Sequence, residues 1–193
     1  MITLFIACET TGAWQWRLPD NDPAQPHVVR VAAAIARIDD GAVIGESCIL
    51  IQPEADWHFE DGAVNAHGIT AAIASDRGQL ADDVRAQLHM LMETAQVVVG
   101  FGLDFQLRTL GRLFDGAPPT IPAGQFCCMK NARDVVKKPR MQPGGGYAIP
   151  TFAETYRHIA AADLPTSDDP IEAGLLKVRA VRAIYDGLTR GKR

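Results

Sequence analysis

Apolar residues recur along the chain in runs whose spacing predicts alternating strands and helices. Residues 2–8 are mostly apolar, as in a strand buried on both faces. Two further apolar runs, 28–39 and 42–53, flank the turn signal Asp39-Asp40-Gly41 and predict a β-hairpin. The alanines of the first run leave a helix open as the alternative. Three prolines in 13–27 indicate a loop, and a second loop is expected over 53–62.

The second half of the chain alternates between helical and strand-like patterns. Apolar positions spaced three and four apart predict helices over 79–95, 104–114, 151–162 and 170–191, with Thr151 as the N-cap of the third. A short helix capped by Thr70 follows a turn at His67-Gly68. Short apolar runs at 96–101 and 125–130 predict buried strands. We therefore expect an α/β fold, in which a mixed central sheet of antiparallel meander and parallel strands is flanked by helices.

Composition and charge narrow the class of protein without naming a function. The length of 193 residues fits a single domain, 1–193, and the net charge of −4 does not attract polyanions over the whole surface. The cysteines show no zinc-binding spacing, so reduced core residues in a cytoplasmic protein are expected. No signal peptide precedes the first strand, and no apolar run is long enough for a membrane.

The end of the first predicted strand carries candidate chemistry. Glu9 follows an apolar run and precedes Thr10, Thr11 and a glycine, at the kind of strand end where α/β proteins place active sites. The position two residues earlier, on the same face of the strand, is Ala7. The strand end thus has the form of a metal site but only one carboxylate.

Five stretches occur together in the order of one known family. They are 7–12 (ACETTG), 66–70 (AHGIT), 101–110 (FGLDFQLRTL), 128–130 (CMK) and 172–177 (EAGLLK). In these stretches the chain resembles the DEDD 3′–5′ exonucleases of DEDDh type, which have a ribonuclease H-like fold. The resemblance covers nearly the whole chain and implies that fold.

The resemblance also implies which residues occupy the family's catalytic positions. In that family four carboxylates hold two divalent ions and a further residue deprotonates the attacking water. Ala7, Glu9, Gln106 and Lys177 fall on the carboxylate positions, and Glu172 falls on that of the general base. Three of the four acids are missing, so we expect a degenerate site with no metal and no cofactor.

Nearby acids offer an alternative in which the site is rebuilt. Asp104, Asp168, Asp169 and Glu172 are close in sequence to the lost positions, and Mg²⁺ or Mn²⁺ would be needed only if they restore it. Asp104 and the Asp168-Asp169 pair are better explained as acids at helix starts. We expect instead that the ammonium of Lys177 pairs with Glu9. The competing interpretation is a Lys177 that extends into solvent.

Candidate residues for nucleic-acid binding come from two regions. Thr10, Thr11 and Trp14, followed by Trp16, lie just after the first strand. The second region is a basic run, namely Lys130, Arg133, Lys137, Lys138 and Arg140, ahead of three consecutive glycines, and further basic residues (Arg190, Lys192, Arg193) close the chain. A solvated charged face and packed tryptophans are the simpler alternatives.

Three functions follow from these observations. The first is an impaired exonuclease-like protein that binds single-stranded DNA or RNA ends, or a protein partner, without metal-dependent hydrolysis. The second is an active 3′–5′ exonuclease with an altered metal site. The third is an oligomeric scaffold, such as a homodimer, since members of the family often dimerise.

Overall fold

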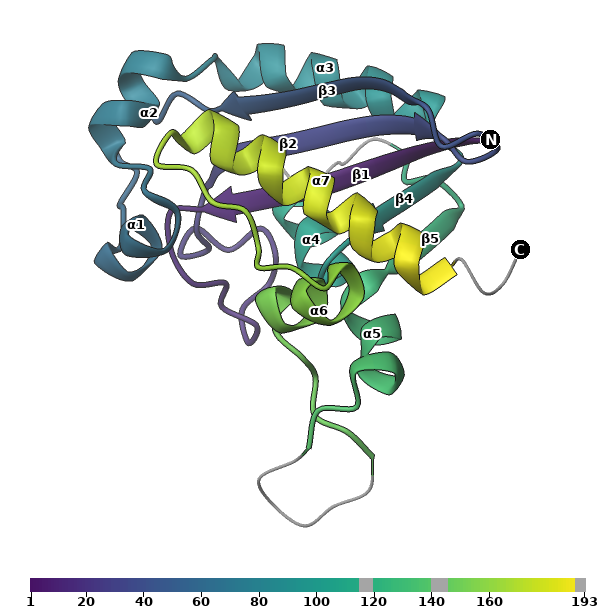
Figure 1. Ribbon diagram of the computed structural model, residues 1–193. Helices are drawn as coiled ribbons and strands as arrows, with labels where there is room; N and C mark the ends of the chain where they lie inside the picture. The colour runs from purple at the N-terminus through teal and green to yellow at the C-terminus, as the bar shows by residue number, and fades with distance from the viewer. Residues whose placement is uncertain (115–119, 140–145, 190–193) are drawn as a thin grey trace.

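A five-stranded sheet with the order β3-β2-β1-β4-β5 forms the centre of the molecule (Figure 1). The computed structural model describes residues 1–114, 120–139 and 146–189. The strands are β1 (Ile2–Thr10), β2 (Val28–Arg37), β3 (Val43–Leu50), β4 (Val97–Gly100) and β5 (Gly124–Cys127). β1, β2 and β3 pair antiparallel, whereas β4 lies parallel to both β1 and β5. The expected mixed sheet is confirmed.

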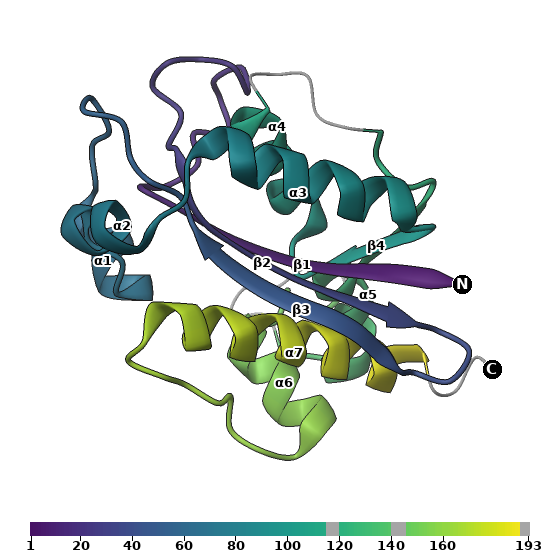
Figure 2. The same cartoon turned by 90° about the horizontal axis from the view of Figure 1, so that it is seen from above.

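Helices cover both faces of this sheet. They are α1 (Asp61–His67), α2 (Ala71–Arg77), α3 (Ala81–Thr94), α4 (Leu103–Leu113), α5 (Cys128–Val136), α6 (Phe152–Ala160) and α7 (Pro170–Thr189). α3 and α4 lie on one face and α7 on the other, with α5 and α6 beside α7 (Figures 1 and 2). In the part of the chain that the structure describes, no helix has the length and apolar character needed to cross a membrane.

β1 is buried on both faces because its residues alternate between the two helical layers. Leu4, Ile6 and Cys8 belong to the core shared with α3 and α4. Phe5 belongs to the core shared with α7. The same alternation places Ala7 and Glu9 on the α7 side. The strand therefore aims the candidate site at α7.

The alanines of the first hairpin strand have a packing role. Ala32, Ala34 and Ala36 of β2 lie in the core with Val178 and Val181 of α7. Small side chains at these positions let the helix approach the sheet closely. The hairpin prediction is confirmed, and the helical alternative for residues 28–39 is wrong because pairing with β1 and β3 overrides the helix propensity of alanine.

Helix caps agree with the local sequence. Thr70 accepts a hydrogen bond from the Ile73 amide at the start of α2. Thr151 and Glu154 form a capping box at the start of α6. The Asp169 carboxylate accepts from the Ile171 amide and the Glu172 amide, each at 2.9 Å, at the start of α7. The prediction of these helix starts is confirmed.

Two local predictions are wrong. The strand expected over 125–130 ends at Cys127, and α5 begins at Cys128. β5 has lost its partner there, since β4 ends at Gly100 opposite Cys127 and the chain turns into α4. Cys127 and Cys128 still lie in opposite cores. The loop expected over 53–62 extends only to Glu60, because α1 begins at Asp61 and ends at the left-handed Gly68.

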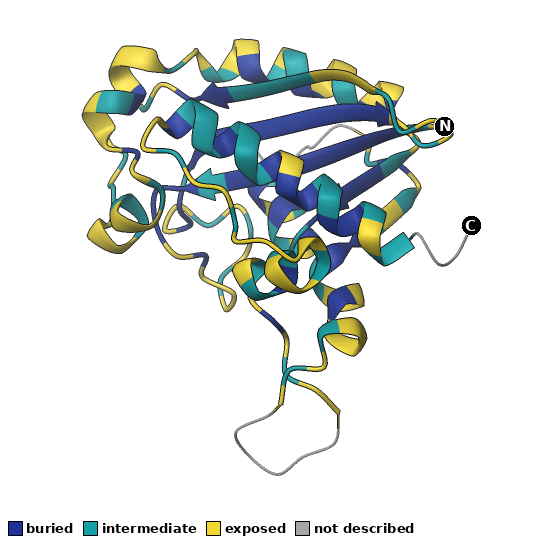
Figure 3. Ribbon diagram, viewed as in Figure 1, coloured by how far each residue is buried: buried dark blue, intermediate teal, exposed yellow. Residues whose placement is uncertain are grey.

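Gly174 lies where α7 approaches the sheet closely. Figure 3 shows buried residues along the side of α7 that meets the strands. A Cβ at Gly174 would lie 2.3 Å from the Cys48 sulfur and 3.1 Å from Cδ of Arg30. The glycine therefore leaves room for the Arg30 side chain beneath the helix.

Replacing Gly174 with alanine is expected to lower the free energy of unfolding by about 1–3 kcal/mol, because overpacking outweighs the gain in helix propensity. Gly111→Ala is the matched control in α4, where an added Cβ meets nothing within 4 Å. That variant is expected to be stabilised by up to ~1 kcal/mol. Urea unfolding of both variants measures the difference, and equal stabilisation would contradict the close packing at Gly174.

Candidate functional site

Glu9 stands directly opposite Arg30 in the β1–β2 register, on the side of the sheet that faces α7. Arg30 Nη2 lies 3.2 Å from Glu9 Oε1. Arg30 Nη1 donates to the carbonyl oxygen of Pro170 at 2.6 Å, at the start of α7. The Arg30 side chain is only 4% exposed, so its charge depends on Glu9 for neutralisation. The arginine thus joins both strands to the helix.

Lys177 of α7 provides the second cation on the same carboxylate. Its ammonium donates to Glu9 Oε1, as the sequence predicted, and the alternative of a solvent-directed Lys177 is wrong. The Lys177 side chain is 34% exposed, against 20% for Glu9. Glu172 pairs with Arg179 at 3.4 Å. The helix therefore places an ammonium at a position that the resemblance assigns to a carboxylate.

The charge state of Glu9 reflects these two cations. Burial alone would raise the pKa of Glu9, but the charge and hydrogen bond of Lys177, together with the charge of Arg30, lower the pKa below 4.5. Glu9 is therefore ionised at neutral pH. The same burial raises the pKa of the neighbouring Cys8 thiol to about 12, so that this cysteine stays protonated.

Gln106 has a structural role. It is 5% exposed. Its side-chain oxygen accepts from the Cys8 amide at 2.6 Å, and its side-chain nitrogen donates to the Phe101 carbonyl at 3.3 Å. The pairing of β1 with β4 ends at Ile6, so the Cys8 amide has no partner in β4. The Gln106 side chain supplies that partner.

His67 closes the other side of the strand end as a neutral ring. Its Nδ1 accepts from the Ile69 amide at 3.0 Å, so Nε2 carries the proton and donates to the Thr10 carbonyl at 3.2 Å. Burial lowers the pKa of His67 below 6.5, although the charge of Glu9 opposes this shift. Protonation would set an N–H of the ring against the Ile69 amide.

The side chains at the four positions that the resemblance assigns to metal-binding carboxylates do not fit a pair of divalent ions. Ala7 has no ligand atom, the Gln106 oxygen is occupied, and Glu9 is bonded by two cations. Across the described residues, no three histidine, cysteine, aspartate or glutamate side chains come close enough together to hold a metal.

The acids that could have rebuilt a metal site do not lie together. Asp104 lies in the first turn of α4 and pairs with Lys130 at 2.8 Å. Asp169 caps α7 and pairs with Arg77 at 2.7 Å. Asp168 is the one that lines the same cleft as Glu9. One carboxylate beside Lys177 does not replace three lost ligands.

A cleft of about 450 Å³ opens beside Glu9. α1 and its C-cap form one wall, α7 forms another, and the segment that precedes α7 forms the rim. Its lining includes Glu9, Arg30, Asn65, His67, Phe152, Leu164, Pro165, Thr166, Ser167, Asp168 and Lys177. The sequence analysis missed Arg30, although a lone arginine in the apolar run 28–36 was a signal for a buried ion pair.

The basic run is separate from this cleft. Lys130, Arg133, Lys137 and Lys138 are not among the residues that line it. Lys138 pairs with Glu154 at 2.7 Å and Arg133 with Asp134 at 3.4 Å. Arg140, the first two of the three glycines, and the basic residues 190, 192 and 193 lie outside the described residues. The structure thus does not bring the basic run and Glu9 together.

The candidates after β1 are mostly internal. Thr10 and Thr11 are buried, and Thr11 accepts from the His27 amide at 3.1 Å. Trp14 is 8% exposed and packs edge-on against Phe105, which favours the packing interpretation over base stacking. Trp16 is 64% exposed, with the Arg108 guanidinium 5.9 Å from the centre of its ring. Of these residues, Trp16 is the exposed aromatic one, and the Arg108 guanidinium lies over its ring.

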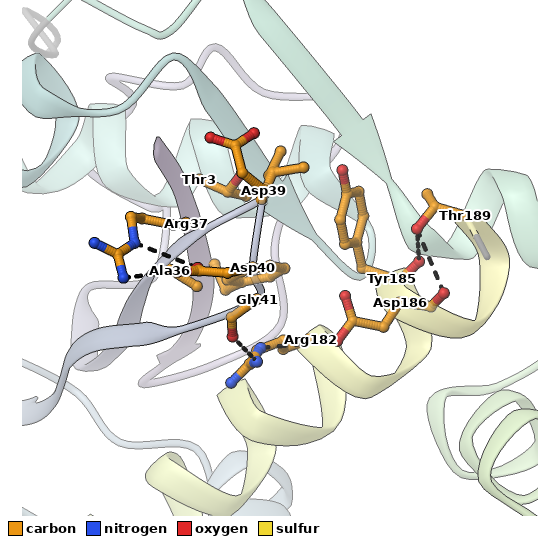
Figure 4. A pocket seen from close by; sticks show the side chains of 12 residues that line it. Thr3, Ala36, Arg37, Asp39, Asp40, Gly41, Arg182, Tyr185, Asp186 and Thr189 are labelled. Atoms are coloured by element: carbon orange, nitrogen blue, oxygen red, sulfur yellow. Dashed lines mark hydrogen bonds and ion pairs between the residues drawn. The ribbon is translucent and has the colours of Figure 1, made fainter. Parts of the chain in front are cut away.

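A second cavity of about 320 Å³ lies at the opposite end of β1, between the β2–β3 turn and the end of α7 (Figure 4). Arg182 donates to the Gly41 carbonyl there, and Arg37 pairs with Asp40 at 2.7 Å. The Thr3 hydroxyl is buried without a partner among the described residues. None of the candidate catalytic or nucleic-acid-binding residues named from the sequence lines this cavity.

Comparisons with known proteins show what this arrangement resembles. Neither a protein-family model nor the sequence of a curated protein matches this chain. A crystal structure of exonuclease I in complex with the inhibitor BCBP is similar, with a TM-score of 0.71 and 20% identity, over 100% of this chain and 41% of that one. E. coli exonuclease I in complex with a dA16 oligonucleotide has a TM-score of 0.68 and 19% identity, over 98% and 41%. The ExoI/SSB-Ct complex has a TM-score of 0.70 and 19% identity, over 100% and 41%.

These similarities confirm the ribonuclease H-like exonuclease fold expected from the sequence. The chain therefore has the fold of these exonuclease I structures. This chain spans about two fifths of the length of the exonuclease I chains (41% in each of the three comparisons above). At identities of 18–20%, the likeness carries the fold and leaves the activity to the residues of the site.

Arg30 depends on Glu9 more than Lys177 does, because the Arg30 side chain is more deeply buried. Glu9→Gln is expected to lower the free energy of unfolding by about 3–5 kcal/mol, because it leaves Arg30 buried without a carboxylate. Lys177→Met is expected to lower it by only about 1 kcal/mol, because Arg30 still neutralises Glu9. Denaturant unfolding at neutral pH measures both. Equal losses would contradict the dependence of Arg30 on Glu9.

His67 is expected to make the protein less stable as the pH falls below about 6.5. Because the pKa of His67 is lowered in the folded protein, the unfolded chain binds the proton more readily. His67→Gln should therefore flatten the change in unfolding free energy between about pH 7 and pH 5. Imidazole ¹⁵N chemical shifts of the wild-type protein should show a proton on Nε2 alone at pH 7, and a proton on Nδ1 would contradict the assigned hydrogen bonds.

Proposed function

We propose that this chain is an exonuclease-like domain that binds single-stranded nucleic-acid ends without metal-dependent hydrolysis. The observation that carries the proposal is the pairing of Glu9 with both Lys177 and Arg30. The exonuclease fold supports the choice of this cleft, and the resemblance assigns the position of Lys177 to a metal ligand. Solved complexes of exonuclease I with a dA16 and a dT13 oligonucleotide support the choice of ligand.

Electrostatics favour binding over hydrolysis. An ammonium about 4 Å from a divalent ion is repelled by about 8 kcal/mol at an effective dielectric constant of about 20. Glu9, already bonded by two cations, does not recover this cost. Phosphate oxygens, in contrast, are attracted to an ammonium on a cleft wall. The alternative of an active nuclease with an altered site is therefore disfavoured.

A protein partner is the second candidate for the same fold. The ExoI/SSB-Ct complex shows that a protein of this fold is found with SSB-Ct, which supports such a partner. Homodimerisation and the scaffold function stay predictions. The nucleic-acid proposal comes first because the cleft itself lies at Lys177.

The proposal predicts binding without cutting. An end-labelled single strand of about 12 nucleotides, mixed with excess protein and Mn²⁺ at low salt, should show a lasting rise in fluorescence anisotropy. The rise should shrink as salt is added, and gels should show an unchanged strand length.

Two results would contradict this proposal. Shortening of the strand that EDTA blocks, and that disappears in Glu9→Gln under conditions where this variant is folded, would show an active site that hydrolyses. Shortening that persists in Glu9→Gln would instead be assigned to a contaminating nuclease. A flat anisotropy trace would show that the domain does not bind single strands and would favour the protein partner.

A further inference from the structure

Lys177 is the exposed member of the charged group at the end of β1. Glu9 carries one negative charge and is bonded by two cations, so these three side chains together carry one excess positive charge. The Arg30 side chain is 4% exposed and is also held by the Pro170 carbonyl. The Lys177 side chain is 34% exposed and lines the cleft. The excess charge therefore meets solvent at Lys177.

Hydrogen-bond donors near Lys177 are available to a ligand. An ammonium has three N–H groups, and Glu9 Oε1 is the only acceptor that bonds Lys177 Nζ within the described residues. Thr166 and Asn65 line the same cleft, and the residues that the structure describes offer no hydrogen-bond partner to either side chain. The cleft thus combines the exposed ammonium of Lys177 with polar groups suited to an anion, and Asp168 is the one further carboxylate among its lining residues.

The cleft is large enough for more than an inorganic ion. Its volume of about 450 Å³ lies within the range of ligand pockets, roughly 300–1,000 Å³. Phe152, Leu164 and Pro165 give it an apolar wall. A ligand with a phosphate at one end and a sugar and base at the other could place the phosphate at Lys177 and the sugar and base against these apolar residues.

We infer that the cleft binds the terminal phosphate monoester of a single strand, with the phosphate on Lys177. This inference rests on the proposed function and adds the kind of end that is bound. A phosphate monoester carries a charge of about −1.5 to −2 at neutral pH, more than the single charge of each internal phosphodiester. It also presents three oxygens to the donors of the cleft. The excess positive charge therefore favours a phosphorylated end over a hydroxyl end.

Asp168 is expected to weaken phosphate binding, so that replacing it provides a second test of the inference. Its exposed carboxylate lines the same cleft and repels a phosphate. Asp168→Asn should therefore strengthen binding of the phosphorylated strand. The expected gain is a few-fold, because the repulsion of an exposed charge is weakened by solvent and salt.

The experiment compares three labelled strands of one sequence, namely 3′-phosphorylated, 5′-phosphorylated and with hydroxyls at both ends. Anisotropy titrations in EDTA prevent any cutting. One phosphorylated strand is expected to bind about tenfold more tightly than the hydroxyl strand, since one added charge-assisted hydrogen bond is worth about this factor. Excess inorganic phosphate should remove the preference if the phosphate group alone is recognised, and leave part of it if the attached nucleotide contributes.

Lys177→Met should abolish the preference, because Arg30 keeps Glu9 neutralised but no ammonium is left in the cleft. Arg37→Met is the matched control. It also removes one cation paired with a carboxylate, but at the β2–β3 turn, where Arg37 pairs with Asp40. This variant should keep the preference, and thermal unfolding curves should show that both variants are folded.

The outcomes separate this inference from the proposed function. Equal, salt-sensitive binding of all three strands would overturn the inference and leave the proposed function standing, as would a preference that survives Lys177→Met. Failure of all three strands to bind would overturn both. A preference that is lost in Lys177→Met, kept in Arg37→Met and increased in Asp168→Asn would establish the terminal phosphate as the ligand.

Discussion

The ion pairs on Glu9 are the interaction on which the rest of the site depends. One carboxylate at the end of β1 joins Arg30 of β2 and Lys177 of α7, and Arg30 in turn bonds the first residue of α7. A charge as deeply buried as that of Arg30 is tolerated only when it is paired. The carboxylate of Glu9 therefore holds the helix and both strands together, and it is the one acid at the four positions that the resemblance assigns to metal ligands.

Packing decides whether these charges can meet. The alanines of β2 and the glycine at position 174 bring α7 close to the sheet, so the Lys177 ammonium reaches Glu9 and Arg30 lies beneath the helix. Gln106 fixes the strand from the other side by bonding the Cys8 amide. Around the strand end, Gln106 bonds the backbone of β1, and Glu9 and Lys177 belong to the ion pairs.

The proposed function rests on the same balance of charges. Two cations of the protein lie at the end of β1, which opposes metal binding there and favours an anionic ligand. The described members of the basic run, on α5 and just after it, do not strengthen this effect because they do not line the cleft and several are paired with acids. Any recognition of a single strand therefore depends on the cleft at Lys177 more than on the charge of the surface.

The sequence alone was enough to predict the mixed sheet, the hairpin and the helix caps at Thr70 and Thr151. Through the resemblance, it also predicted the pairing of Lys177 with Glu9. These features follow from local periodicity, capping chemistry and the order of motifs, all of which are written along the chain. Other features are seen only in the folded protein, namely the pairing of Arg30, the burial of Trp14, the helix that begins at Cys128 and the absence of the described basic run from the cleft lining. Strand register, the end of a neighbouring strand and the reach of a side chain across a core depend on residues far apart in sequence, so no local pattern determines them.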